Sequence, residues 1–122
     1  MKYLCVGYFE PAKMDALSKA QVDAVMSKCP HHMEELHQTG QLLTVAGVDV
    51  EARYLRRAYG QVQISDRPGK ESQEMIGCVY IIEARDMADA IRVASLHPTT
   101  QVEAAEQLGW RTEIRPIHTF ER

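Results

Sequence analysis

The segment GQVQISDRPGKESQEMIGCVYIIEARD, residues 60–86, decides the expected fold of this chain. It contains two runs typical of β-strands, Gln61–Ser65 and Cys78–Glu83. A polar segment joins them, and its Pro68-Gly69 pair predicts a turn. Polar loops of this length in compact chains are either functional or simply solvated. The side chains in this loop that are able to do chemistry are Asp66, Arg67, Lys70, Glu71, Ser72 and Glu74.

Four further strands are expected around this segment. Tyr59-Gly60 predicts a hairpin turn between one of them and Gln61–Ser65, with Tyr54 pointing inward. Pro116 places the last strand at an edge of the sheet or at its own end, because proline has no amide proton to donate. The expected ranges are Lys2–Phe9, Gln41–Val48, Arg53–Tyr59 and Trp110–Ile117.

The first helical region is expected to begin at Ser18 and to end at Gly40. Ser18 is a good N-cap residue, and Leu17 before it fits a hydrophobic staple. Apolar residues recur at steps of three and four along the region, which predicts one buried stripe. Pro30 interrupts the stripe and predicts a kink or a break into two helices, since it removes one backbone donor.

A second helix is expected after Asp86, with Asp86 as its N-cap and Asp89 as the capping-box partner. His97-Pro98 ends this helix. A short helix at Val102–Leu108 then ends at Gly109. The predicted buried face of the second helix consists of Met87, Ala90, Ile91 and Ala94.

Length and composition predict one domain, residues 1–122, of ordinary globular character. The net charge of −3 argues against nucleic-acid binding, which needs a basic surface. No apolar run approaches the roughly 20 residues of a membrane span, and no signal peptide is evident. Cys5, Cys29 and Cys78 lack disulfide-like spacing, so we expect reduced thiols and a cytoplasmic location.

The order of elements predicts an α+β fold of the ferredoxin-like kind, an antiparallel sheet with helices on one face. The predicted strands are apolar on both sides, whereas two helices cover only one face. The uncovered face is therefore expected to pair with a second copy, which gives a homodimer through the sheet.

The chain resembles the YCII-related family, in its DGPF branch, over nearly its whole length. The resemblance is strongest in ISDRPGKESQEMIGCVYIIEARDMADAI and in SLHP…LGWRTEIRPI. Where DGPF proteins have Asp-Gly-Pro-Phe, this chain has Asp66-Arg67-Pro68-Gly69, so the turn is expected to differ. Cys29 aligns with the position of the histidine in the His–Asp pair of smaller YCII enzymes.

The resemblance implies a dimeric α/β barrel with a ligand cleft. One related branch of the family acts on chlorinated hydroxyquinones, and DGPF proteins are often linked with extracytoplasmic-function sigma factors. The resemblance thus favours a small cytoplasmic protein that binds a small polar or aromatic molecule, and transforms it by acid/base chemistry without a cofactor. The alternative is a non-catalytic regulatory module that associates with a sigma factor. Whether the chain is an enzyme stays open.

The sharpest catalytic hypothesis is His97 as a general base with Asp66 as its orienting carboxylate. The structural alternative is that His97 bonds the last carbonyl groups of its helix. Arg115 beside Glu113 is suited to clamp an anionic group, or else forms an exposed ion pair. The expected substrate-binding residues are Arg115, Glu71, Tyr80 and Arg67.

A metal site is not expected. Cys29, His31, His32 and His37 lie on one predicted helix, where Cys29 and His32 share a face. His37 points elsewhere, and the spacing matches no zinc motif, which needs three convergent ligands.

Overall fold

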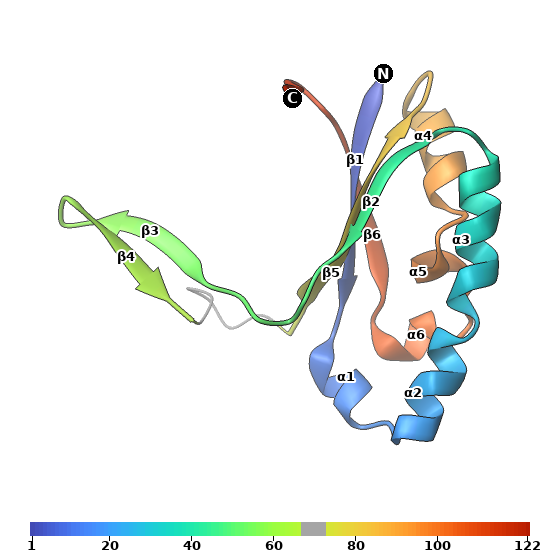
Figure 1. Cartoon of the computed structure of the whole chain (residues 1–122), viewed down its shortest axis with the longest axis horizontal. Coiled ribbons are helices and arrows are strands. Elements are labelled where there is room, and N and C mark those ends of the chain that lie inside the picture. Colours follow the sequence, from blue (N-terminus) through green and yellow to red (C-terminus); the bar gives the residue numbers. More distant parts are fainter. Residues whose placement is uncertain (67–72) are drawn as a thin grey trace.

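The computed structural model describes residues 1–66 and 73–122. Its body is a four-stranded sheet with helices on one face, and a two-stranded hairpin projects from it (Figure 1). The sheet contains β1 (Lys2–Phe9), β2 (Leu42–Gly47), β5 (Met75–Glu83) and β6 (Arg111–Pro116), and the hairpin contains β3 (Tyr54–Ala58) and β4 (Gln61–Ser65). The helices are α1 (Pro11–Asp15), α2 (Lys19–Met26), α3 (Cys29–Gln38), α4 (Met87–Ala94), α5 (Pro98–Gln101) and α6 (Ala105–Leu108).

The sheet has the order β2-β5-β1-β6, and its paired strands are antiparallel. Its first and third strands in chain order, β1 and β5, are central, which is the arrangement of a ferredoxin-like fold. The predicted α+β class is therefore confirmed. β6 lies at an edge and ends at Pro116, as the missing amide proton of proline predicted.

The first helical region begins and breaks where the sequence predicted. Ser18 Oγ accepts a hydrogen bond from the backbone N–H of Gln21, and the Gln21 side chain accepts one from the N–H of Ser18. This is a complete capping box. The region breaks between α2 and α3, and Pro30 lies in the first turn of α3, where its missing N–H costs nothing.

The second predicted helix, α4, is capped as expected and buries Ala90 and Ala94 as predicted, but the rest of its buried face differs. Asp86 Oδ1 accepts from the N–H of Asp89, whereas the Asp89 carboxylate accepts from the N–H of Arg85. The buried residues are Asp89, Ala90, Val93 and Ala94, so the predicted burial of Met87 and Ile91 is wrong. Two overlapping stripes fit the helical period, and packing on the sheet selects the one that contains Val93.

The segment after α4 also differs from the expectation of one helix at Val102–Leu108. It forms two short helices, α5 and α6, because Pro98 is well placed to begin a new helix directly after His97. Gly109, with φ +70°, ends α6 in the left-handed conformation.

The core lies between the sheet and the helices. Tyr3 and Cys5 of β1 and Tyr80 and Ile82 of β5 pack there with residues of α3 and α4. Because side chains alternate along a strand, their neighbours point to the opposite face. On that open face Leu4 pairs with Ile81 and Val6 with Val79, so its centre is apolar.

The hairpin of residues 54–65, here called the arm, lies away from the four-stranded sheet (Figure 1). Its turn is the predicted one, with φ of +54° at Tyr59 and +74° at Gly60. Two residues with positive φ are what a tight type I′ hairpin requires. The prediction that Tyr54 points inward is wrong, because 36% of that residue is exposed on the arm.

Within the described residues, no helix combines the length and the apolarity that a membrane crossing requires.

Asp89 of α4 provides a test of how much a buried, hydrogen-bonded carboxylate stabilises the fold. Its buried carboxylate accepts hydrogen bonds from the N–H of Arg85 and from the Arg92 guanidinium at 2.7 Å. These bonds lower the pKa of Asp89 to about 2. Since an unfolded aspartate has a pKa near 3.9, the stabilisation is present above about pH 4 and is lost as the pH falls towards 2.

Asp89→Asn should therefore lower the free energy of unfolding at pH 7, and the difference from the native chain should shrink at pH 2–3. Urea unfolding at both pH values measures this. Asp23→Asn, at an exposed position of α2, is the matched control and should unfold like the native chain. An Asp89→Asn chain as stable as the native one at pH 7 would contradict the prediction.

Candidate functional site

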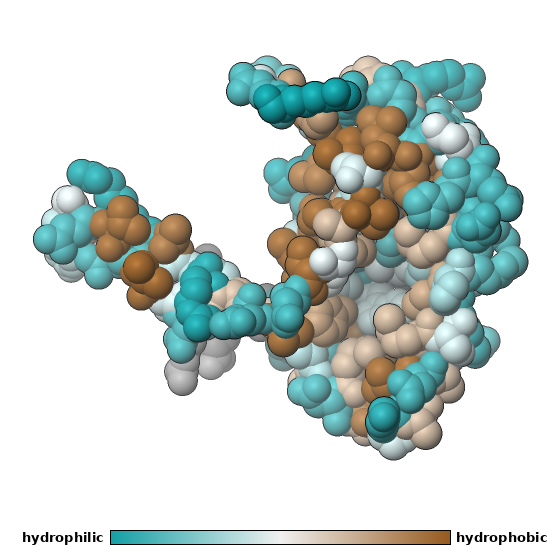
Figure 2. Space-filling view, in the orientation of Figure 1, coloured by the Kyte–Doolittle hydropathy of each residue, from teal (hydrophilic) through white to brown (hydrophobic). Residues whose placement is uncertain are grey.

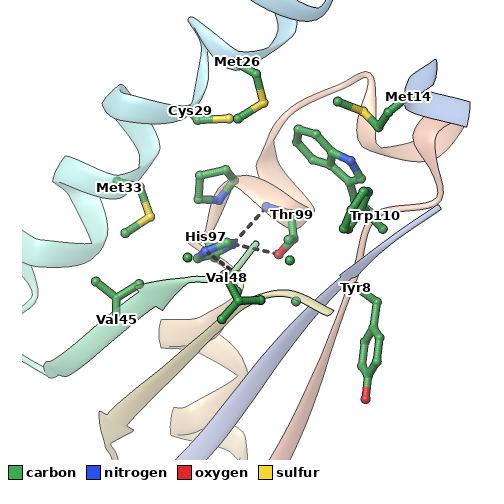
Figure 3. A pocket seen from close by; sticks show the side chains of 16 residues that line it. Tyr8, Met14, Met26, Cys29, Met33, Val45, Val48, His97, Thr99 and Trp110 are labelled. Carbon is green, nitrogen blue, oxygen red and sulfur yellow. Dashed lines mark hydrogen bonds between the residues drawn. The ribbon is translucent and has the colours of Figure 1, made fainter. Parts of the chain in front are cut away.

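A pocket of about 390 Å³ lies between the sheet and the helices, beside the end of α2 and the start of α3 (Figure 3). Its volume is that of a typical site for a small molecule. Most of its wall is apolar, and the side chains of Met14, Met26, Met33, Val45, Val48 and Trp110 surround it in Figure 3. Methionine side chains adapt easily to the shape of a bound molecule. The pocket therefore suits a compact, largely apolar ligand.

His97 is the main polar group in the wall of this pocket. The backbone N–H of Thr99 donates to His97 Nδ1 at 3.1 Å, so the imidazole caps the N-terminus of α5. Because Nδ1 accepts this bond, its lone pair is occupied, and the proton of the neutral ring belongs on Nε2. Nε2 lies 3.7 Å from Cys78 Sγ, a weak partner. His97, which lines the pocket, is thus a hydrogen-bond donor at Nε2 with a weak partner.

The His97 ring is held neutral by its surroundings. Only 6% of the residue is exposed, and its ring stacks on Tyr80 with the ring centres 4.6 Å apart. Burial lowers the pKa of His97 to about 4, since a charged imidazole would lose its hydration. Thr99 Oγ1 lies 2.9 Å from Nδ1 and also contacts Thr112, which fixes the ring plane.

Two cysteines line the pocket beside His97. Cys78 comes from β5 and Cys29 from α3, and both are free thiols. Burial raises the pKa of each thiol, so both are protonated near neutral pH. Gly7 allows the close packing here, because a Cβ at this position would lie 2.5 Å from Cys78 Sγ.

The six residues predicted from the sequence for the site fall in different places. His97 lies in the pocket wall, and Tyr80 lies behind it, fully buried, with its hydroxyl donating to the carbonyl of Ala94. Asp66 is exposed directly after β4, at the end of the arm. Within a single chain it therefore does not lie beside His97. Arg67 and Glu71 lie outside the described residues.

Arg115 lies on the other side of the sheet from His97. It pairs with Leu4 across the strands, which places it on the open face, and its Nε donates to Glu113 Oε2 at 2.9 Å. Most of the Arg115 side chain is exposed. This is the exposed ion pair that the sequence left as the alternative. In one chain, Arg115 and His97 do not face the same ligand.

Glu74, the last acidic residue of the polar loop, pairs with Arg111. The guanidinium donates two hydrogen bonds to the carboxylate, at 2.6 and 3.0 Å, and lies over the ring of Tyr8. This pair lowers the pKa of Glu74 and ties the start of β5 to β6. Sequence reasoning missed Arg111, because its partner is 37 residues away along the chain.

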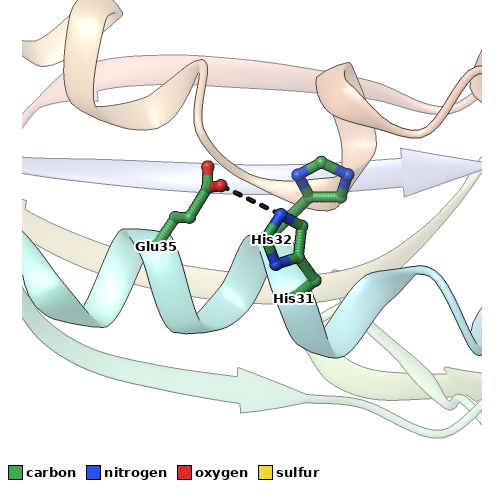
Figure 4. A group of neighbouring side chains, drawn as sticks. All are labelled: His31, His32 and Glu35. Atoms are coloured by element: carbon green, nitrogen blue, oxygen red, sulfur yellow. Dashed lines mark ion pairs between the residues drawn. The ribbon is translucent and has the colours of Figure 1, made fainter.

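A second cluster of polar side chains lies on α3 (Figure 4). His31 Nε2 pairs with Glu35 Oε1 at 3.0 Å, and the two together with His32 offer ligand atoms within 4.8 Å of one another. His32 Nδ1 is buried and has no hydrogen-bond partner among the described residues. This group has three members, which is the number of protein ligands in a catalytic zinc site, whereas a structural site has four. Cys29, which the sequence places near this cluster, lines the pocket instead.

Sequence and structure comparisons identify related proteins. The YCII-related domain matches residues 1–111 of the chain. No curated protein matches its sequence. A similar solved structure is 5-chloro-2-hydroxyhydroquinone dehydrochlorinase (TftG) from Burkholderia phenoliruptrix AC1100, in complex with 2,5-dihydroxybenzoquinone. The TM-score is 0.51 at 15% identity, over 96% of this chain and 93% of the other, so the likeness is one of fold. These comparisons lend no support to a sigma-factor partner.

The assignment of the His97 proton leads to a direct test by NMR. Long-range ¹H–¹⁵N spectra of the imidazole should show a protonated Nε2 and a lone pair on Nδ1 throughout pH 5–8, because the ring titrates only near pH 4. His37, which is exposed on α3, serves as the internal comparison. A proton on Nδ1, or titration of His97 near pH 6.5, would contradict the assignment.

The lowered pKa of His97 also makes the stability of the folded chain depend on pH. The folded chain binds a proton at His97 less readily than the unfolded chain, whose histidine titrates near pH 6.5. This contribution to stability is present above pH 6.5 and is lost as the pH falls towards 4, by at most about 1.4 kcal/mol per pH unit.

Proposed function

The chain belongs to the YCII-related family, and on this premise we propose that it binds a small aromatic or quinone-like molecule in the pocket beside His97. The observation that carries the proposal is the neutral imidazole of His97 in the wall of an apolar pocket, with the weak partner Cys78 Sγ at 3.7 Å from its Nε2. Such a donor recognises an acceptor oxygen, a carbonyl or a phenol, on a ligand that is otherwise apolar. The bound 2,5-dihydroxybenzoquinone of TftG has this chemistry.

The same geometry supports acid/base chemistry without a cofactor. A neutral histidine that donates a hydrogen bond stabilises negative charge as it develops on a ligand oxygen. In an apolar pocket such a bond is strong, because little water competes for it. We therefore infer that His97 polarises a carbonyl or phenolic oxygen of the bound ligand through its Nε2–H.

The predicted role of His97 as a general base is less well supported than this donor role. A base needs a free lone pair, and the Nδ1 lone pair accepts from Thr99. Asp66 and Arg115, the other residues expected to act with His97, lie away from the pocket in one chain. Of the candidates that the structure describes, His97 alone lines the pocket.

We also infer that the chain is a homodimer through the open face of its sheet. Leu4, Val6, Val79 and Ile81 form the apolar centre of this face, and none of the helices α1–α6 covers it (Figure 1). Apolar sheet faces of this kind are normally packed against another layer. The three free thiols are consistent with a cytoplasmic location, where thiols stay reduced.

Two probes of similar ring size test the role of His97. 2,5-Dihydroxybenzoquinone offers acceptor oxygens, whereas p-xylene offers none. His97→Asn keeps an oxygen near the position of Nδ1, which preserves the cap of α5, but it removes the Nε2–H donor. The substitution should weaken quinone binding about tenfold, the usual value of one hydrogen bond, and leave p-xylene binding nearly unchanged.

Calorimetric titration of both probes measures the two affinities. His37→Asn, at the exposed histidine of α3, is the control and should match the native chain for both. Equal loss for both probes would mean that His97→Asn deforms the pocket, and no loss for the quinone would refute the donor role. A native chain that binds neither probe would refute the proposed ligand class.

A further inference from the structure

The arm has one apolar face and one polar face. Its cross-strand pairs place Leu55 opposite Ile64 and Arg57 opposite Val62, on one side of the hairpin. The pairs on the other side are Tyr54 with Ser65, Arg56 with Gln63 and Ala58 with Gln61. Alternation is strict in β4, where Val62 and Ile64 alternate with polar residues, and such alternation is typical of a sheet with one buried face. Among the described residues of one chain, however, none buries this face.

The apolar face of the arm is almost entirely in solvent. The exposed fractions are 69% for Leu55, 62% for Val62 and 71% for Ile64. An isolated two-stranded hairpin is at best marginally stable in water and needs another layer to pack against. Hydrophobic side chains are visible both on the arm and over the sheet of the body (Figure 2). Residues 1–66 and 73–122 of a single chain therefore give the apolar face of the arm no layer to pack against.

The arm extends to the side of the body opposite the helices (Figure 1). This is the side of the open sheet face, which the proposed dimer covers. A second copy seated on that face would lie beside the arm, and a twofold axis would place the second arm beside the first body. The two apolar surfaces of one chain cannot meet each other in that chain, but two copies satisfy both at once.

Charge also favours a second copy of this chain over an unrelated partner. The arm, residues 54–65, contains Arg56 and Arg57 and no acidic residue, so it has a formal charge of +2. Since the whole chain has a net charge of −3, the remainder has a charge of −5. A positive arm is thus attracted to the negative body of another copy.

We propose that the arm is an exchange element, whose apolar face of Leu55, Val62 and Ile64 packs on the second copy in the homodimer. Each chain clasps the other, in addition to the contact through the sheets. The proposal rests on the proposed dimer but not on its ligand. It also gives a role to the exposed hairpin, which the fold of the body does not require.

Two measurements on the intact chain test the clasp. Sedimentation equilibrium gives the dimer dissociation constant, and amide hydrogen exchange reports protection in β3 and β4. Leu55→Gln/Ile64→Gln makes the apolar face polar, and Gln61→Ala/Gln63→Ala changes two residues of the opposite face as a matched control. We expect a native dimer with protected arm amides whose protection is lost on dilution below the dissociation constant.

The apolar-face variant should raise the dissociation constant at least tenfold, and the control should stay within about twofold of the native chain. A native dimer with unprotected arm amides, or equal effects of the two variants, would overturn the clasp and leave the sheet contact standing. A native monomer at 100 μM would overturn both. Binding of 2,5-dihydroxybenzoquinone in the same samples reports separately on the proposed function.

Discussion

The stacking of His97 on Tyr80 is the contact on which the rest of the site depends. Tyr80 stands at the centre of the sheet, on β5, and is completely buried. The imidazole lies parallel to it, with 5° between the ring planes, at the junction of α4 and α5. This packing excludes water from one side of the histidine and joins the sheet to the helical layer. The ring is therefore neutral because of the same contact that positions it.

Local signals in the sequence determined most of the backbone. The Ser18 cap, the break at Pro30 and the turn at Tyr59-Gly60 each depend on a few neighbouring residues, and the structure has all three. Their physical causes, a side-chain acceptor, a missing amide proton and positive φ, act within one turn of the chain. Such features are readable without knowledge of the tertiary fold.

Features that depend on contacts between residues far apart in the chain could not be predicted from the sequence. α4 buries Val93 rather than Met87, because the sheet selects between two stripes of equal period. Periodicity alone could not show that β3 and β4 leave the sheet, since they look like ordinary strands. For the site, the sequence pointed to His97 but not to its capping role. Pro98 directly after it, at the first position of a helix, was the available signal.

The arm joins the body at a point where the strands of the body are already paired, so the arm is structurally separate from the body. The backbone N–H of Val48 donates to the carbonyl of Gly77 at 3.0 Å, so β2 and β5 are already paired where the chain departs and returns. The described residues between these two, apart from Met75 and Ile76 of β5, form an inserted segment outside the four-stranded sheet. Its length and sequence are free to vary through evolution without changing the register of a single strand in the body. In this architecture the pocket and the arm can diversify separately.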